Sequence, residues 1–208
     1  MSTELLSVSN LSCEREQRLL FSGVSFCVTN SEILQISGPN GSGKTTMLRS
    51  LAGVSTCCDG EIHWRGRPVA DARYQYQSES IYLGHESAVK LALTPRENLR
   101  WDCALWNLGD DGVDAALIKI GLSPYLDIAC ARLSAGQRRR VALARLLLNP
   151  AVLWILDEPF TAIDAEGVIQ LESLLADHIA SDGAVILTTH QALADDLPVT
   201  QLRLGAAA

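Results

Sequence analysis

Residues 32–46 read EILQISGPNGSGKTT, and between Gly38 and Thr45 they match the pattern G-x-x-x-x-G-K-[ST]. The apolar residues of 32–37 predict a strand, and the residues from Lys44 onward predict a helix. A glycine-rich turn that joins a strand to a helix directs backbone N–H groups inward, and such a nest binds anions at the helix N-terminus. The segment therefore predicts a phosphate-binding loop.

This loop supplies both a cation and a metal ligand. We expect the Lys44 ammonium to reach the terminal phosphates of a bound nucleotide and the Thr45 hydroxyl to ligate Mg²⁺. The candidate nucleotide-binding residues here are Gly38, Pro39, Asn40, Gly41, Ser42, Gly43, Lys44, Thr45 and Thr46. The segment thus predicts a nucleoside triphosphate and Mg²⁺ as its ligands.

A second motif lies at residues 153–158, which read LWILDE. A run that is apolar on both faces is typical of a buried strand in a parallel sheet, and ligands of such sheets bind at the carboxyl ends of the strands. We expect Asp157 to hold Mg²⁺ directly or through water, and Glu158 to polarise the attacking water. Asp157 is therefore a candidate metal ligand and Glu158 a candidate catalytic residue.

Composition sets limits on the class of protein. The 208 residues suit one compact domain, and 48% apolar with 20% charged residues argue against disorder and against a coiled-coil rod. A net charge of −7 argues against direct binding of nucleic acid over a basic surface. The N-terminal residues lack the pattern of a secretory signal, so we expect a cytosolic chain whose six cysteines are free thiols packed as small apolar residues.

Hydrophobic patterning outside the two motifs predicts the rest of an α/β fold. Residues 184–187 read as a second buried strand and 166–179 as a covering helix. Short alternating pieces at 5–8, 24–28 and 61–64 predict an antiparallel edge layer. A capping box at Thr94 and Glu97 opens a helical stretch. The predicted architecture is a single domain over 1–208, with a mostly parallel core sheet flanked by helices and a helical subdomain inserted at about 94–133.

A third motif narrows the class. Residues 133–137 read LSAGQ before an expected helix, with Ser134 as the N-cap. The pentapeptide resembles the signature of ABC-type ATPases, with Ala135 in place of the usual glycine. The resemblance implies a P-loop ATPase that forms a head-to-tail homodimer, in which the signature contacts ATP bound by the other subunit. The residues implied in that contact are Ser134, Ala135, Gly136 and Gln137.

The same resemblance gives roles to two further segments. His190 follows the strand ending in Thr188-Thr189 and matches the family's switch histidine, which contacts the γ-phosphate and helps to place water. It is therefore a second candidate catalytic residue. Residues 160–164 resemble the loop that contacts its counterpart across the dimer. The basic run 138–140 is interpreted as a charged face near the nucleotide interface.

Two positions depart from the family's pattern. His85 stands where most members have a glutamine, and because Mg²⁺ prefers oxygen ligands, an imidazole is a poor direct ligand. We keep His85 as a candidate metal ligand beside two other interpretations, a coupling residue and a non-catalytic loop residue. Arg15 falls where the family usually places an aromatic side chain that stacks on adenine.

Segments 133–141 and 153–164, together with the Gly84-His85 pair, are similar to the ATP-binding subunits of cytochrome c maturation systems, a group of haem exporters within the ABC family. The resemblance implies an ATPase at the cytoplasmic face of the bacterial inner membrane, bound to integral CcmB-like and CcmC-like subunits. It links ATP hydrolysis to haem export or to release of a haem-loaded chaperone. The chain itself is then expected to contact haem only through its partners. Alternatives are another ABC exporter or importer with a different membrane partner, and a soluble ABC ATPase acting on nucleic acid or a scaffold.

Overall fold

The computed structural model describes residues 3–205, so Met1 and Ser2 of the N-terminal stretch and residues 206–208 lie outside the described part. The chain forms two compact units. The first unit consists of Met1–Tyr82, Ala151–Glu158 and Leu175–Ala208, and the second consists of Leu83–Pro150 and Pro159–Leu174. The predicted helical segment 94–133 lies inside the second unit.

A five-stranded sheet forms the centre of the first unit, with the order β6-β7-β8-β3-β9. Its strands are β3 (Glu32–Ser37), β6 (Ser80–Leu83), β7 (Leu153–Asp157), β8 (Ala184–Thr188) and β9 (Val199–Arg203). Strand β8 pairs in parallel with β3 on one side and with β7 on the other. Every residue of β7 and β8 is buried, which confirms the buried parallel strands predicted from their continuous apolar runs.

An antiparallel sheet forms a second layer of this unit, with the order β2-β1-β4-β5. Its strands are β1 (Glu4–Arg15), β2 (Arg18–Thr29), β4 (Cys58–Trp64) and β5 (Arg67–Pro68). The predicted antiparallel layer is confirmed, but β1 and β2 are each 12 residues long rather than short pieces. Register shifts along β1, including one between Val8 and Leu11, interrupt the apolar alternation, so the pattern shows only part of each strand.

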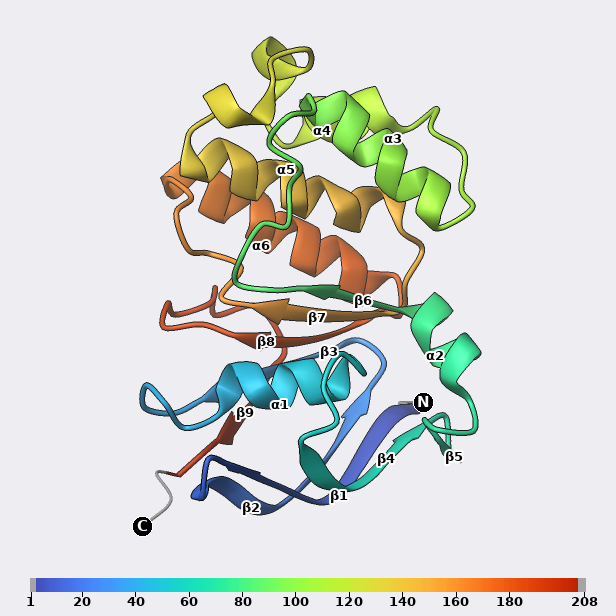
Figure 1. Cartoon of the computed structure of the whole chain (residues 1–208), viewed down its shortest axis with the longest axis vertical. Coiled ribbons are helices and arrows are strands. Elements are labelled where there is room, and N and C mark those ends of the chain that lie inside the picture. Colours follow the sequence, from blue (N-terminus) through green and yellow to red (C-terminus); the bar gives the residue numbers. More distant parts are fainter. Residues whose placement is uncertain (1–2, 206–208) are drawn as a thin grey trace. The chain divides into compact units, whose positions relative to one another are not determined.

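Helix α1 (Lys44–Leu51) packs between the two sheets (Figure 1). Its side chains Met47, Leu48 and Leu51 are fully buried in one core with residues of both sheets. Helix α2 (Arg73–Glu79) joins this core through Tyr76, whose hydroxyl donates a hydrogen bond to the Leu51 carbonyl at 2.6 Å. Helix α1, which follows the phosphate-binding loop, is therefore packed against residues of both sheets and is bonded at its end to α2.

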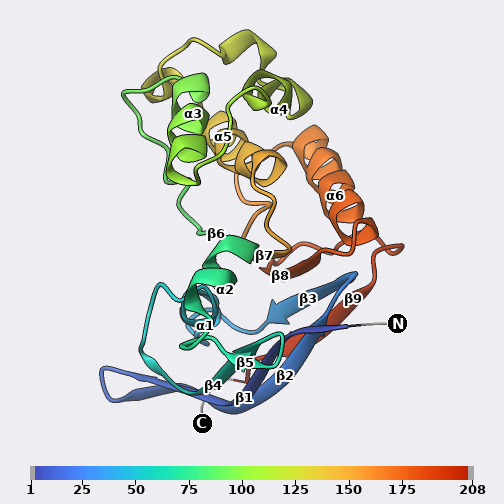
Figure 2. The same cartoon turned by 90° about the vertical axis from the view of Figure 1, so that its right-hand side faces the viewer.

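The second unit is helical. It contains α3 (Pro95–Leu105), α4 (Val113–Lys119), α5 (Ala135–Leu148) and the short 3₁₀ turns η1 (Ser123–Tyr125) and η2 (Cys130–Arg132). Helices α3, α4 and α5 pack on one another around a shared apolar core (Figure 2). Helix α6 (Ala165–Ala180) begins in this unit and ends in the first. The predicted capping box is confirmed, because Thr94 accepts a hydrogen bond from the Glu97 N–H and the Glu97 carboxylate accepts one from the Thr94 N–H.

A buried ion pair fixes the connection that leads into α3. The Arg145 guanidinium contacts the Asp102 carboxylate at 2.7 Å, and both side chains are about nine-tenths buried. The same guanidinium donates to the carbonyls of Ser87 and Ala88. Arg145 of α5 thus holds both α3 and the segment before it. Among residues 3–205, no helix is long and apolar enough to span a bilayer.

Candidate functional site

The loop between β3 and α1 has the backbone conformation that an anion nest requires. Gly41 and Gly43 have φ angles of 79° and 90°, a region that residues with a side chain rarely adopt. A Cβ atom on Gly43 would also lie 2.9 Å from a ring carbon of Phe21. Both constraints explain why glycine occupies this position, at the N-cap of α1.

The side chains of the loop fit a phosphate group. Lys44 Nζ lies over the loop and donates to the carbonyls of Gly38 at 2.8 Å and Pro39 at 3.2 Å. The Ser42 hydroxyl is buried and has no hydrogen-bond partner among the described residues. A buried polar atom without a partner is unfavourable, and a phosphate oxygen in the loop would satisfy it. Thr45 is exposed in the first turn of α1, where its hydroxyl is open to a metal ion.

Sheet register aligns the loop with the two predicted carboxylates. Thr188, the last residue of β8, lies opposite Ile36 on one side and opposite Asp157 on the other. Asp157, the last residue of β7, is therefore level with the end of β3, where the phosphate-binding loop begins. Asp157 is 1% exposed. The structure thus brings the loop and both carboxylates to one edge of the sheet.

Thr188 connects Asp157 and Glu158. Its hydroxyl donates a hydrogen bond to Asp157 Oδ1 at 2.8 Å and accepts one from the Glu158 N–H at 3.0 Å. Glu158 has a φ angle of 48°, a strained conformation for a residue other than glycine. The Thr188 hydroxyl therefore stabilises the sharp turn that directs the Glu158 carboxylate. No sequence pattern indicated this role of Thr188, and its position two residues before His190 is the one signal that could have suggested it.

His190 lies beside Glu158, with 3.5 Å between its Nε2 and Glu158 Oε1. The histidine side chain is 65% exposed, whereas the glutamate side chain is 19% exposed. The first unit therefore holds together the two residues predicted to be catalytic. A carboxylate and an imidazole at this separation can share one water molecule or one proton.

We expect Thr188→Val to lower the turnover number for ATP by about 10-fold to 100-fold, because misplacement of a catalytic group by about 1 Å is enough for such a loss. Valine keeps the shape of the side chain but removes the hydroxyl that both Asp157 and Glu158 use. Steady-state kinetics should show a fall in kcat with little change in KM. Thr188→Ser should restore most of the rate; a serine variant as slow as the valine variant would contradict a positioning role.

The second unit places the LSAGQ motif at the start of α5. Ser134 is the N-cap, and its hydroxyl accepts a hydrogen bond from the Gln137 N–H at 3.1 Å. The Gln137 side chain in turn accepts from the Ser134 N–H at 2.8 Å, which completes a capping box. The predicted N-cap is confirmed. A Cβ on Gly136 would lie 2.5 Å from the Ala162 carbonyl oxygen, so this position requires glycine.

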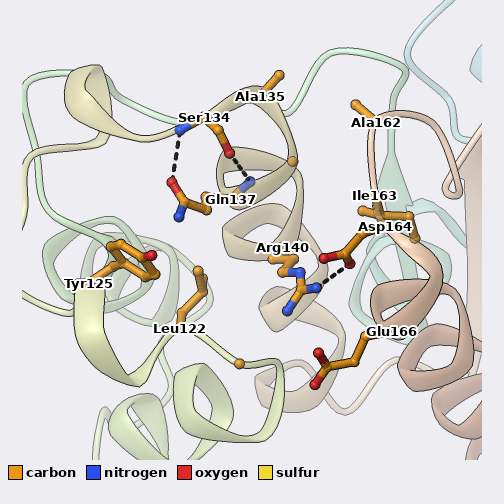
Figure 3. A pocket seen from close by; sticks show the side chains of 12 residues that line it. Leu122, Tyr125, Ser134, Ala135, Gln137, Arg140, Ala162, Ile163, Asp164 and Glu166 are labelled. Atoms are coloured by element: carbon orange, nitrogen blue, oxygen red, sulfur yellow. Dashed lines mark hydrogen bonds and ion pairs between the residues drawn. The ribbon is translucent and has the colours of Figure 1, made fainter.

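This motif opens onto a pocket of about 550 Å³ within the second unit (Figure 3). Its lining residues come from the segment between α4 and the end of η1, from the start of α5, and from the loop before α6 with the first turn of that helix, and they include Tyr125, Gln137 and Arg140. The Arg140 guanidinium forms an ion pair with Asp164. The Gly167 N–H and Arg140 both lower the pKa of the Asp164 carboxyl below its usual range. The motif and the loop 160–164 thus line one pocket.

The run 138–140 does not form the charged face that we predicted. Arg139 is 3% exposed and donates to the carbonyls of Gly84 at 2.8 Å and Pro159 at 3.3 Å. Three consecutive helix residues point in different directions, so they cannot share one surface. Arg139 therefore supports the backbone next to His85, whose own side chain is exposed.

The residues predicted for the site are divided between the units. The first unit contains the phosphate-binding loop, Asp157, Glu158 and His190, whereas the second contains Ser134–Gln137 and His85. Arg15, the predicted position of the adenine contact, is exposed at the end of β1 and lies 3.7 Å from the carboxylate of Glu16. The site of the first unit has the parts of a P-loop nucleotide-binding site.

Comparison with known proteins agrees with the fold and the loop. The family model for ABC transporters matches residues 21–161, about two thirds of the chain. The chain belongs to the ABC transporter family, and it is an ABC-type ATPase with a P-loop α/β fold. A solved structure described as the ATP-binding subunit of an ABC transporter superposes with a TM-score of 0.83 at 25% identity, over 96% of this chain and 88% of that one.

Within the family, the chain is similar to the cytochrome c biogenesis ATP-binding export protein CcmA. It is 48% identical to the CcmA of Hahella chejuensis, over 98% of this chain and 97% of that protein. It is 47% identical to the CcmA of Pseudomonas fluorescens, over 93% and 92% of the two chains. The similarity therefore covers both units and not only the phosphate-binding loop.

Proposed function

We propose that this chain is the ATP-hydrolysing subunit of an ABC transporter complex that acts in cytochrome c biogenesis, where hydrolysis serves haem export or release of a haem-loaded chaperone. The similarity to CcmA over nearly the full length of both chains carries the proposal. The chain then works as a single ABC ATPase domain, with the helical segment 94–133 inserted in its nucleotide-binding core.

Nucleotide binding rests on the first unit. Residues Gly38 to Thr46 hold the phosphates of ATP, with Lys44 moving from its loop carbonyls to the terminal phosphates. Thr45 and Asp157 are the residues that would hold Mg²⁺, and their oxygen atoms suit that ion. The bound ion would neutralise part of the phosphate charge. Asp157 is kept in place by the Thr188 hydroxyl.

Hydrolysis rests on Glu158 and His190. Glu158 orients the attacking water and accepts its proton, because its carboxylate lies at the sheet edge next to the phosphate-binding loop. His190, 3.5 Å from that carboxylate, contacts the terminal phosphate and limits the positions that water can take. The short separation supports a joint role for these residues.

The complete site requires a second copy of the chain. Ser134, Ala135, Gly136 and Gln137 of one subunit contact ATP held by the loop of the other, so that a homodimer encloses two nucleotides. The N-terminus of α5, where backbone N–H groups have no partner within the helix, suits such an anion. Closing and reopening of this dimer would transmit the energy of hydrolysis.

A surface of the second unit suits a membrane subunit. Trp101 and Leu105 lie one turn apart on α3 and are 51% and 68% exposed. Lys90 lies over the Trp101 ring at 5.0 Å, which joins the segment after His85 to the same surface. Exposed apolar groups on one helix face are typical of a protein contact. We place the CcmB-like partner here, with a CcmC-like subunit in the same complex at the cytoplasmic face of the inner membrane and with haem carried only by partners.

The test is a pull-down from detergent-solubilised membranes with Glu158→Gln bound to ATP and Mg²⁺, because that variant should hold the dimer closed. We expect to recover haem-handling membrane subunits. Trp101→Ala in the same background should reduce that recovery, while Tyr74→Ala, which removes an exposed aromatic side chain from α2, should not. Recovery of an unrelated permease would leave the ATPase mechanism standing and overturn the assignment to cytochrome c biogenesis.

His85 is proposed as a coupling residue rather than a direct metal ligand, since its side chain is exposed and Arg139 fixes its backbone. In the reconstituted complex, His85→Gln is expected to reduce the stimulation of ATP hydrolysis by the membrane partners. Unchanged stimulation would contradict the coupling role.

A further inference from the structure

Three cysteines that lie far apart in the sequence meet in the first unit. Cys13 belongs to β1, Cys57 directly precedes β4, and Cys58 is the first residue of β4. Their sulfur atoms all lie within 4.8 Å of one another. The sequence predicted only free thiols packed as small apolar residues. That prediction is wrong for Cys57, which is exposed, and for Cys27, also exposed on β2.

We propose that Cys13, Cys57 and Cys58 form a binding site for one thiophilic d¹⁰ metal ion, Zn²⁺ or Cu⁺. Sulfur ligands select these ions over Mg²⁺ and Ca²⁺. The Sγ atoms of Cys13 and Cys57 are 3.7 Å apart. Two thiolates bound tetrahedrally at the usual Zn–S length of about 2.3 Å lie about 3.8 Å apart, so this pair already has the required spacing.

Hydroxyl groups around the cluster support thiolate ligands. The Ser55 hydroxyl donates to Cys57 Sγ at 3.1 Å, and the Ser50 hydroxyl donates to Cys58 Sγ at 3.0 Å. Donors of this kind orient metal ligands and stabilise their negative charge. The hydrogen bond from Ser55 lowers the pKa of the Cys57 thiol. Cys57 is thus the exposed ligand, open to an entering ion.

The pKa of the buried Cys13 thiol is shifted in the opposite direction to that of Cys57. Burial raises the pKa of Cys13 to about 12, and burial also raises the pKa of Cys58. Binding of a metal ion must therefore displace a proton from Cys13, whose thiol lies 3.3 Å from the Cys57 carbonyl oxygen. In residues 3–205, no other histidine, cysteine or carboxylate belongs to this cluster. The site has three protein ligands and leaves room for an external fourth one.

The site would join β1 and β4 to the end of the helix that follows the phosphate-binding loop. Ser50 belongs to α1, Cys57 and Cys58 follow α1 by a short turn, and Cys58 pairs with Cys13 of β1. Because Cys13 and Cys58 are register partners, a bound ion would cross-link the antiparallel sheet at this point. An ion that binds only the folded chain must raise its stability.

The experiment uses the full chain, reduced and freed of metal with a chelator, then titrated with Co²⁺ and Zn²⁺ without nucleotide. We expect one equivalent of Co²⁺ to give thiolate-to-metal charge-transfer absorption, which Zn²⁺ then displaces, and Zn²⁺ to raise the melting temperature. Cys57→Ser and Cys58→Ser each remove a direct ligand and should weaken binding by more than about 10²-fold, the upper end of what loss of a group that only orients a ligand costs. Cys27→Ser, which alters an exposed cysteine outside the cluster, should bind as the wild type does.

Native mass spectrometry of the chain as purified then identifies the resident ion, with Zn²⁺ or Cu⁺ as the supporting result. The proposal is overturned if no thiolate absorption develops, or if the absorption survives in both Cys57→Ser and Cys58→Ser. It is also overturned if the chain, once reduced, re-oxidises in air to a disulfide among these cysteines and binds no metal ion when it is kept reduced. The readouts do not depend on ATP hydrolysis, so they are independent of the proposed function.

Discussion

Replacement of Glu158 by glutamine is expected to lower ATP turnover by about 10²-fold to 10⁴-fold, the usual contribution of a general base. Glutamine preserves the length of the side chain and the hydrogen bond from the Glu158 N–H to the Thr188 hydroxyl. It removes the carboxylate that we propose as the acceptor of a proton from water. Nucleotide binding should remain close to that of the wild type, because the proposed phosphate contacts come from the loop that ends at Thr46 and not from Glu158. Single-turnover hydrolysis and equilibrium nucleotide binding measure the two effects separately.

Lys44→Ala serves as the contrasting variant. It removes the ammonium that lies over the loop at 2.8 Å from the Gly38 carbonyl, so its main effect should be a loss of nucleotide binding. Glu158→Gln and Lys44→Ala should therefore fail at different steps. Intact turnover in Glu158→Gln would mean that another group is the base, with His190 as the nearest candidate.

Replacement of Asp102 by leucine is expected to lower the free energy of unfolding by about 3–5 kcal/mol, the usual effect of removing one member of a buried ion pair. The variant leaves the guanidinium of Arg145 buried without its carboxylate, with only the carbonyls of Ser87 and Ala88 as hydrogen-bond acceptors. Urea denaturation followed by circular dichroism measures the change.

Two controls separate burial from charge. Asp110→Ala breaks the Arg100–Asp110 pair, whose side chains are more than half exposed, and should change the stability by less than about 1 kcal/mol. The double variant Asp102→Leu, Arg145→Met replaces both charges with apolar groups and should recover much of the loss. Equal effects of Asp102→Leu and Asp110→Ala would contradict the argument from burial.

The elements that could be predicted from the sequence alone are each specified by a pattern of residues close together in the chain. Strand β3 and the loop after it follow from residues 32–46, because a short apolar run followed by glycines at fixed spacing specifies backbone conformation over a few residues. The caps at Thr94 and Ser134 follow from spacings of three residues for the same reason. The family signature is likewise contained in one short segment, residues 133–137.

Only the tertiary structure decided which distant residues meet. Thr188 contacts Asp157 across 31 positions because β8 pairs with β7, and strand order has no local signal. Arg139 is buried although its neighbours in the sequence suggested a charged surface. The cysteine cluster joins Cys13 to Cys57 across 44 positions. Such contacts depend on how elements pack and pair, and that arrangement is fixed by burial of the whole apolar core rather than by the residues on either side of each position.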